Sequence, residues 1–241
     1  MPFVVIEAPT ELGLKREHPD RPMGVVRLPD ALRRAGFPRM IGASDGGRIV
    51  PPAYDASRNP PDRVLNLEGI HAFSLALARP VEESVRGGRV PVVLGGDCSL
   101  LLGSLLGLKK IGRFGLAFID GHSDFYTPAT STTGGVAGMD LAIACGRAVE
   151  RLSTLAPPEP LIVPEDVVLL GRRDIEEART FGGEPDGAVQ DWPLPRIRDA
   201  GLRNATKQAI AHFQSREVEG VWVHIDADVL HDDLMPAVDS R

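Results

Sequence analysis

The chain has 241 residues and a formal net charge of −6, from 27 Lys and Arg against 33 Asp and Glu. A hydrophobic content of 43 % beside 25 % charged residues is ordinary for a folded globular protein and excludes disorder and collagen-like repetition. The acidic balance argues against nucleic acid as a partner, because phosphate binding needs a basic face. No apolar stretch is long enough to cross a bilayer, so we expect no membrane partner.

The cysteine usage indicates the compartment. Cys98 and Cys145 are the only two cysteines, so a disulfide framework is not expected. The N-terminal residues also lack the basic segment that opens a signal peptide. We therefore expect a reducing, cytoplasmic location.

The apolar pattern predicts short strands alternating with helices. Five runs rich in Val, Ile and Leu are predicted as buried strands, namely Phe3–Glu7, Val90–Leu94, Gly115–Ile119, Asp166–Leu170 and Gly220–Ile225. Helices are predicted over Asp62–Arg86, Ser99–Lys110, Met139–Cys145 and Pro195–Gln214, with Ile197, Leu202, Ala209 and Phe213 facing inward. Pro80 should break or kink the first of these helices. This alternation favours an α/β fold with a parallel sheet, whose ligands bind beyond the carboxyl ends of the strands.

The first polar cluster follows the predicted strand Val90–Leu94. Gly95 and Gly96 permit a tight turn into a helix, and Cys98 stands near the helix N-terminus, where the dipole should lower the pKa of a thiol. An ordinary strand–helix junction or a phosphate-binding turn is the alternative interpretation. Nucleotide binding has weak support, because neither a G-x-G-x-x-G nor a following G-K-[ST] is present.

The second and third clusters each follow an apolar strand. Asp120, His122 and Asp124 alternate at period two, and so do His224, Asp226 and Asp228. In extended backbone, the members of each set would project to one side. Solvated loops with capping aspartates are the alternative. Carboxylates gathered this closely repel one another without a cation, and oxygen-rich ligation with imidazole suits Mn²⁺. Shared carboxylates would hold two metals about 3.5 Å apart with a hydroxide between them.

These motifs together resemble a known family. The sequences GGDCS, DGHSD and DAD, in this order on successive strands, are similar to those of the ureohydrolase superfamily, which includes arginases, agmatinases, guanidinobutyrases and formimidoylglutamases. The segment GHSDFYTP followed by TSTTGG adds to the resemblance, as does GRRD at Gly171–Asp174. The resemblance covers about residues 94 to 236.

The resemblance implies both a fold and an activity. The fold is a three-layer αβα sandwich around a mainly parallel sheet, formed by residues 1–241 as one domain that lacks the family's C-terminal strand–helix segment. The activity is hydrolysis of a linear amidine or guanidine C–N bond by a metal-bridging hydroxide at a binuclear manganese centre. The implied partners are a guanidino or amidino small molecule and further copies of the chain in a homo-oligomer.

The resemblance also assigns ligands to two metal sites, A and B. Asp120 and Asp226 would bridge both metals, while His122 and Asp228 would complete site B. Asp124 would complete site A and accept a hydrogen bond from the bridging hydroxide, which makes it a catalytic residue. Each of these five positions carries the residue type of the family.

Several positions depart from the family pattern. Cys98 replaces the site A histidine, and because thiolate is a soft ligand we expect one or two Mn²⁺ per chain, with site A weak. Ala137 stands where the family often has a proton-shuttling histidine. Tyr126 and Thr133 fall where family members contact the amino-acid end of the substrate. His224 is an added imidazole, roughly 6–7 Å before Asp226 along a strand. That spacing suits a catalytic contact to a ligand, with a structural histidine as the alternative.

The expected function is therefore metal-dependent hydrolysis of a linear amidine or guanidine. The alternative is a metal-binding homologue with lost or altered activity, which the residues at positions 98 and 137 favour. Arg172, Arg173 and Asp174 could either reach the site or close a loop.

Overall fold

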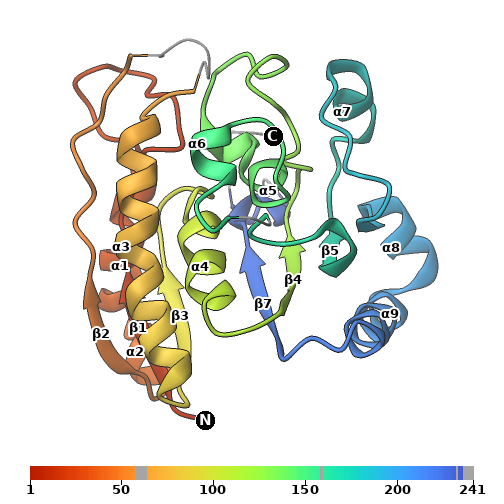
Figure 1. The fold of residues 1–241 in the computed structure, drawn as a ribbon, viewed down its shortest axis with the longest axis horizontal. Helices are drawn as coiled ribbons and strands as arrows, with labels where there is room; N and C mark the ends of the chain where they lie inside the picture. Colours follow the sequence, from red (N-terminus) through yellow and green to blue (C-terminus); the bar gives the residue numbers. More distant parts are fainter. Residues whose placement is uncertain (58–63, 158–159, 232, 236–241) are drawn as a thin grey trace.

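The computed structural model describes residues 1–57, 64–157, 160–231 and 233–235 (Figure 1). Its strands form two parallel sheets, with strand orders β2-β1-β3 and β6-β5-β4-β7. The strands are β1 (Phe3–Glu7), β2 (Ser44–Arg48), β3 (Val90–Leu94), β4 (Phe114–Ile119), β5 (Val167–Leu170), β6 (Gln190–Trp192) and β7 (Gly220–Ile225). The expected α/β fold with parallel strands is confirmed, with the strands divided between two sheets.

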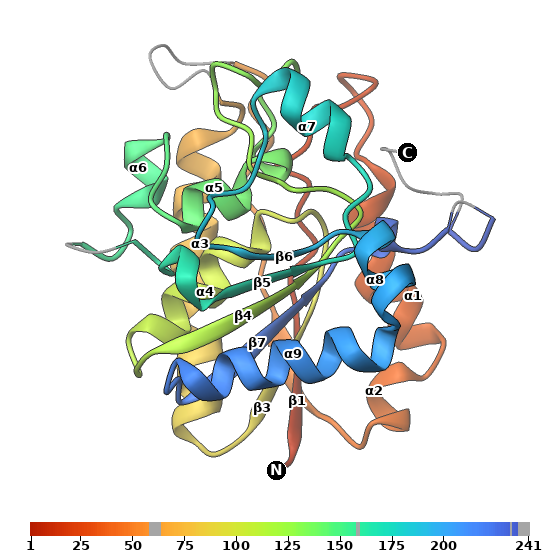
Figure 2. The ribbon, with the colours of Figure 1, turned by 90° about the vertical axis from the view of Figure 1, so that its right-hand side faces the viewer.

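Helices cover both faces of the strands. The helices are α1 (Leu28–Arg34), α2 (Phe37–Met40), α3 (Leu67–Arg86), α4 (Leu100–Lys109), α5 (Asp140–Ala144), α6 (Glu150–Ser153), α7 (Ile175–Phe181), α8 (Leu194–Ala200) and α9 (Leu202–Ser215). Short 3-10 turns are η1 (Gly24–Arg27), η2 (Val136–Gly138), η3 (Pro164–Asp166) and η4 (Ala227–Val229). Figure 2 shows α3 to α6 on one side of the strands and α1, α2 and α8 on the other. This is the three-layer arrangement expected from the sequence.

Strand β4 shows how the layers are built, because its successive side chains face opposite sides. Leu116 and Phe118 are fully buried in the core on the side of α3, α4 and α5. Ala117 lies on the other side and packs in a second cluster with Ala209 and Phe213 of α9. The strand is therefore covered on both faces, as its continuous apolar sequence requires.

Helices α3 and α4 approach each other closely. A Cβ added at Gly107 would lie 2.5 Å from the carbonyl oxygen of Ala78, so only glycine fits there. Pro80 lies inside α3 without ending it, and the predicted break at this residue is wrong. The buried face of α3, which includes Leu77 and Val81, packs on α4 and keeps the helix continuous despite the missing backbone N–H.

Element bounds agree with the prediction wherever apolar runs are long. The predicted helix Pro195–Gln214 is wrong, since Gly201 adopts a φ of 82° and separates α8 from α9. Leu202 then begins α9 and is 70 % exposed, contrary to its expected inward position. The first predicted helix begins at Leu67, and residues 62 and 63 of that prediction lie outside the described residues. Strands β2 and β6 were not predicted, because neither carries an apolar run.

Strand β3 is an edge strand of the first sheet, and β7 is an edge strand of the second. The side chains of Val221, Val223 and Ile225 on β7 are exposed. The carboxyl ends of β3, β4 and β7 are the places where the three polar clusters begin.

Within the described ranges, no helix combines the length and the apolar character needed to span a bilayer.

Candidate metal centre

The three polar clusters converge at the carboxyl ends of β3, β4 and β7. Strands β4 and β7 pair in parallel with Ile119 opposite Ile225, so Asp120 and Asp226 leave the sheet side by side. Cys98 enters from the loop between β3 and α4, and its Sγ lies 2.6 Å from Oδ2 of Asp226. The structure thus brings together residues from three distant parts of the chain.

Two similar turns aim the acids of the β4 and β7 loops. Oδ1 of Asp120 accepts a hydrogen bond from the backbone N–H of His122 at 2.7 Å, and Oδ1 of Asp226 accepts one from Asp228 at 2.8 Å. Short side-chain-to-backbone bonds of this kind are typical of aspartate turns. The prediction that strand alternation brings these side chains to one side is therefore wrong, because β4 ends at Ile119 and β7 at Ile225. The turns, and not extended backbone, direct these side chains.

Asp120, His122 and Asp228 form the first tight group. Their ligand atoms lie within 4.8 Å of one another. Nδ1 of His122 is 2.8 Å from Oδ2 of Asp228 and 3.7 Å from Oδ1 of Asp120. Burial opposes the charged imidazole, but the hydrogen bonds to Asp120 and Asp228 raise the pKa of His122 to about 10. These are the residues that the family resemblance assigns to site B, with Asp120 shared.

Cys98, Asp120 and His224 form the second tight group, also with ligand atoms within 4.8 Å of one another. The ring of His224 stacks on Phe118 with centroids 4.7 Å apart and planes 4° apart. Its Nε2 is buried and has no hydrogen-bond partner within the described ranges. The sequence predicts that His224 contacts a ligand residue from further back along the strand. The length of its side chain brings a ring nitrogen up to the acids.

The thiol of Cys98 behaves differently from the sequence-based expectation. We expected the helix dipole to lower its pKa. Burial raises the pKa of Cys98 well above its ordinary value, and the charges of Asp226 and Asp124 raise it further. The dipole is outweighed because the thiol is buried and also faces several carboxylates. In the absence of metal it is a thiol that donates to Asp226.

Asp124 and Asp140 add two buried carboxyl groups behind these ligands. Asp124 is 7 % exposed with a φ of 47°, and Asp140 is fully buried at the start of α5. The N–H of Ala142 donates to the carbonyl of Asp124 at 3.2 Å and so joins α5 to the loop. Burial, then the charge of Asp120, raises the pKa of both carboxyl groups well above the ordinary value. Sequence reasoning missed Asp140, although an acid opening an apolar helix was a signal.

The residues present fit a divalent cation. Oδ2 of Asp120 and Nε2 of His224 are buried, and neither has a hydrogen-bond partner in the described part of the chain. Buried carboxylates are stable only when they are paired, protonated or bound to metal. Asp120 and His224 both belong to the ligand groups, so a cation there would supply the missing partners.

The GRRD segment supports this centre from outside. The backbone N–H of Arg173 donates to Gly121 at 2.7 Å, and its Nη2 donates to the carbonyl of Asp228 at 2.7 Å. Oδ2 of Asp174 accepts from the backbone N–H and the Oγ of Ser123 at 2.9 and 2.8 Å. Both residues therefore hold the ligand loops in place, and Arg172 pairs with Asp174 and with an acid outside the segment.

The two predicted substrate contacts lie on the loop after Asp124. The ring of Tyr126 packs so tightly on Gly183 that a Cβ there would lie 2.7 Å from it. Burial, then the charge of Glu177, raises the pKa of Tyr126 to about 12. Thr133 uses its Oγ1 locally, where it accepts from the N–H of Gly135 at 3.1 Å.

Comparison with known proteins agrees with this geometry. The model of the arginase family matches residues 23–240. The arginase of Bacillus caldovelox is 31 % identical over 244 residues, which cover 98 % of this chain and 79 % of that protein. The structure of Bacillus cereus arginase gives a TM-score of 0.80 at 28 % identity, covering 98 % of this chain and 78 % of that one. Formimidoylglutamase from Bacillus subtilis shares the fold, with a TM-score of 0.62 at 19 % identity over 98 % of this chain and 70 % of that one. This chain belongs to the arginase family.

Proposed function

We propose that this protein is a manganese-dependent hydrolase that cleaves a C–N bond in a linear guanidino or amidino compound. Membership of the arginase family supports metal-dependent hydrolysis of guanidino and amidino C–N bonds. The observation that carries the proposal is the convergence of Asp120, His122 and Asp228 with unpaired, buried ligand atoms beside them. One or two Mn²⁺ ions per chain would satisfy these atoms.

Each residue of the centre has a role in this reaction. Asp120, Asp226 and their neighbours would hold the cations, which would supply the activation of water for attack on the amidino carbon. Asp124 is buried beside the same acids and would hold a hydrogen bond from the attacking water. His224 would fix the orientation of the ligand groups from the β7 side. Tyr126 would contact the far end of the substrate.

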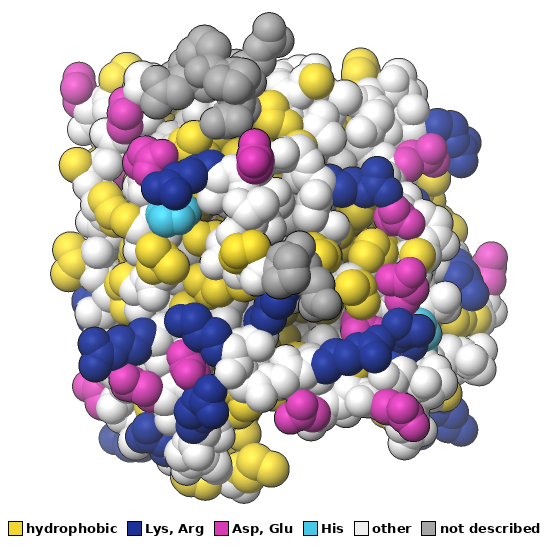
Figure 3. Space-filling model, in the orientation of Figure 1, with side chains coloured by type: hydrophobic (Ala, Val, Ile, Leu, Met, Phe, Trp, Pro, Cys, Tyr) yellow, Lys and Arg dark blue, Asp and Glu magenta, His cyan; other side chains and the backbone are white. Residues whose placement is uncertain are grey.

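Thr133 is proposed as a second substrate contact on the same loop, which also carries Tyr126. The chain is further expected to form a homo-oligomer in the cytoplasm. Both of these statements rest on the family resemblance and stay predictions. On the face drawn in Figure 3, Lys and Arg side chains lie among Asp and Glu, which supports a small molecule over nucleic acid as the partner.

A metal-binding homologue with lost or altered activity is the second candidate. Cys98 at the acid cluster and the buried Ala137 are the observations that favour it. Without an imidazole at position 137, proton transfer to the leaving amine would need another group. The two candidates agree on metal binding and differ on turnover.

A turnover panel separates these candidates. Metal-stripped protein is reloaded with Mn²⁺ and incubated with guanidino and amidino compounds that differ in chain length and end group, and the released amine is measured. We expect turnover of at least one compound and a loss of about 100-fold or more in Asp228→Asn. Stoichiometric metal binding without turnover across the panel would favour the second candidate.

A further inference from the structure

We propose that Cys98, His224 and Asp120 form a thiolate–imidazole–carboxylate site for Zn²⁺ or Co²⁺, beside the Mn²⁺ site of Asp120, His122 and Asp228. The inference rests on the proposed function in requiring that the centre binds metal. Two groups of ligand atoms, each within 4.8 Å, share Asp120 as their common member. The centre is therefore asymmetric, and its two halves select different metals.

The thiol of Cys98 is held facing the acids. A Cβ at Gly96 would lie 1.8 Å from the carbonyl oxygen of Thr10, so the loop after β3 is pressed against the backbone there. Asp97 fixes the next turn, since its N–H donates to Thr10 at 3.2 Å and its Oδ1 accepts from Ser99 at 3.0 Å. These contacts leave Sγ of Cys98 2.6 Å from Oδ2 of Asp226. The thiol is thus not packed away from the ligands.

The imidazole of His224 is equally fixed. His224 stands opposite Phe118 in the β4–β7 register, and the two rings are stacked almost parallel. Stacking sets the plane of the ring. Nε2 is buried and has no hydrogen-bond partner among the described residues. It is therefore free to bind a ligand. A cation between His224 and Cys98 would be the missing partner of this nitrogen.

The donor types decide the metal. Mn²⁺ prefers carboxylate and water oxygens, whereas thiolate and imidazole favour Zn²⁺ and Co²⁺. One sulfur, one nitrogen and one carboxylate oxygen make a set typical of Zn²⁺. The group of Asp120, His122 and Asp228 offers two carboxylates and no sulfur, which suits Mn²⁺. A centre that holds Zn²⁺ in the group with Cys98 and Mn²⁺ in the group with His122 therefore fits the donor types of both groups.

Cobalt titration of the full chain tests this assignment directly. Metal-stripped protein is titrated with Co²⁺, and the near-ultraviolet thiolate-to-cobalt charge-transfer absorption is recorded. We expect one such band per chain, removed by Zn²⁺ and resistant to excess Mn²⁺. Elemental analysis after loading with one equivalent of Zn²⁺ and a large excess of Mn²⁺ should give both metals in one chain.

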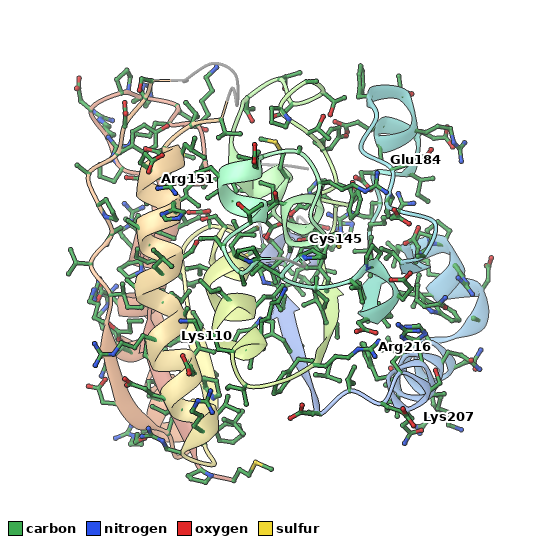
Figure 4. The ribbon with its side chains drawn as sticks, in the orientation of Figure 1. Lys110, Cys145, Arg151, Glu184, Lys207 and Arg216 are labelled. Atoms are coloured by element: carbon green, nitrogen blue, oxygen red, sulfur yellow. The ribbon has the colours of Figure 1, made fainter. Side chains whose placement is uncertain are left out.

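Three variants separate ligation from packing. Cys98→Ser should abolish the cobalt band, while Cys145→Ser, a buried cysteine at the end of α5, should leave it unchanged (Figure 4). His224→Phe keeps a ring to stack on Phe118 but removes both nitrogens. It should weaken Zn²⁺ binding by more than about 100-fold, because losing a partner that only supports a ligand already costs about 10–100-fold, and thermal stability in EDTA should be unchanged.

The outcomes of the titration are distinct. Cobalt binding without a thiolate band, or a band that survives Cys98→Ser, overturns the Cys98–His224 site and leaves the proposed function intact. Equal Zn²⁺ affinity in the wild type and His224→Phe also overturns it. Failure to bind any divalent metal would overturn the proposed function itself.

Discussion

At the scale of single residues, the centre is a set of buried acids that destabilise the metal-free protein. Asp140 is fully buried at the start of α5, and neither of its carboxylate oxygens reaches solvent. Burial and the neighbouring charge of Asp120 raise its pKa well above the ordinary value. The favourable interactions of such groups therefore depend on bound metal.

Asp140→Asn tests this cost. The substitution keeps the shape and removes a carboxyl group whose pKa is raised on folding, so near neutral pH the metal-free protein should be more stable by about 1–3 kcal/mol. Thermal unfolding in excess EDTA measures the change. A lower unfolding temperature would mean that Asp140 makes a favourable bond in the metal-free protein.

Sequence reasoning predicted residues that the structure brings together, but for a partly wrong reason. The spacing of Asp120 and His122, and of Asp226 and Asp228, predicted convergence in extended backbone, whereas turns held by side-chain hydrogen bonds direct these side chains. The reach of His224 could not be predicted, since it depends on the stacking against Phe118 across two strands. Asp140 opens an apolar helix, which was a local signal, but its burial is set by tertiary packing and was therefore missed.

At the scale of elements, close approach between helices fixes where glycine is required. Gly107 of α4 faces the backbone of α3, with only 2.5 Å available between an added Cβ and the carbonyl oxygen of Ala78. Gly69 in the first turn of α3 has space instead, because an added Cβ would be 3.5 Å from its nearest neighbour, Leu12. Substituting each glycine by alanine therefore gives a test variant and its control.

Gly107→Ala should destabilise the fold by about 1–3 kcal/mol through overpacking. Gly69→Ala is the control and should stabilise it by up to about 1 kcal/mol through helix propensity. Urea unfolding of both variants checks the signs. Stabilisation by Gly107→Ala would contradict the tight α3–α4 contact.

An ion-paired aspartate joins three elements on the α9 side. Asp166 ends η3 and contacts Arg113 at 2.6 Å and Arg216 at 2.7 Å, the latter just after α9 (Figure 4). Burial alone would raise the pKa of Asp166, but the hydrogen bonds from Arg113 and Arg216 outweigh it and lower the pKa. The ionised form is thus favoured in the folded protein.

Asp166→Asn should lower the free energy of unfolding by about 1–2 kcal/mol near neutral pH, because the arginines that it leaves unpaired are partly exposed to water. Because the folded pKa is below the unfolded value, this stability is present above the unfolded pKa and is lost as pH falls through the folded one. The wild-type and variant urea midpoints should therefore converge below about pH 4. A constant difference across the whole pH range would contradict the charge-based account.

Elements with strong apolar runs were predictable, and weakly patterned ones were not. The bounds of β1, β3 and β7 follow directly from the sequence, because buried parallel strands are continuous apolar runs. Strand β2, with the sequence SDGGR, forms only by pairing with β1 and has no apolar signal. The break at Gly201 was hidden within one amphipathic pattern.

At the scale of the whole molecule, two parallel sheets bring their carboxyl ends to one place. The loop after β3 belongs to the first sheet, whereas the loops after β4 and β7 belong to the second. The contact between Cys98 and Asp226 joins the sheets at that end. The metal centre therefore links the two halves of the fold, and metal binding should stabilise the whole chain.

The central claim is a metal centre built around Asp120, and Mn²⁺ calorimetry of Asp120→Asn tests it most directly. Asp120 belongs to both ligand groups, so the variant should lose Mn²⁺ binding that the wild type shows under the same conditions. The matched variant Asp166→Asn, which changes a buried acid far from the ligands, should keep it. Wild-type Mn²⁺ affinity in Asp120→Asn would contradict the account.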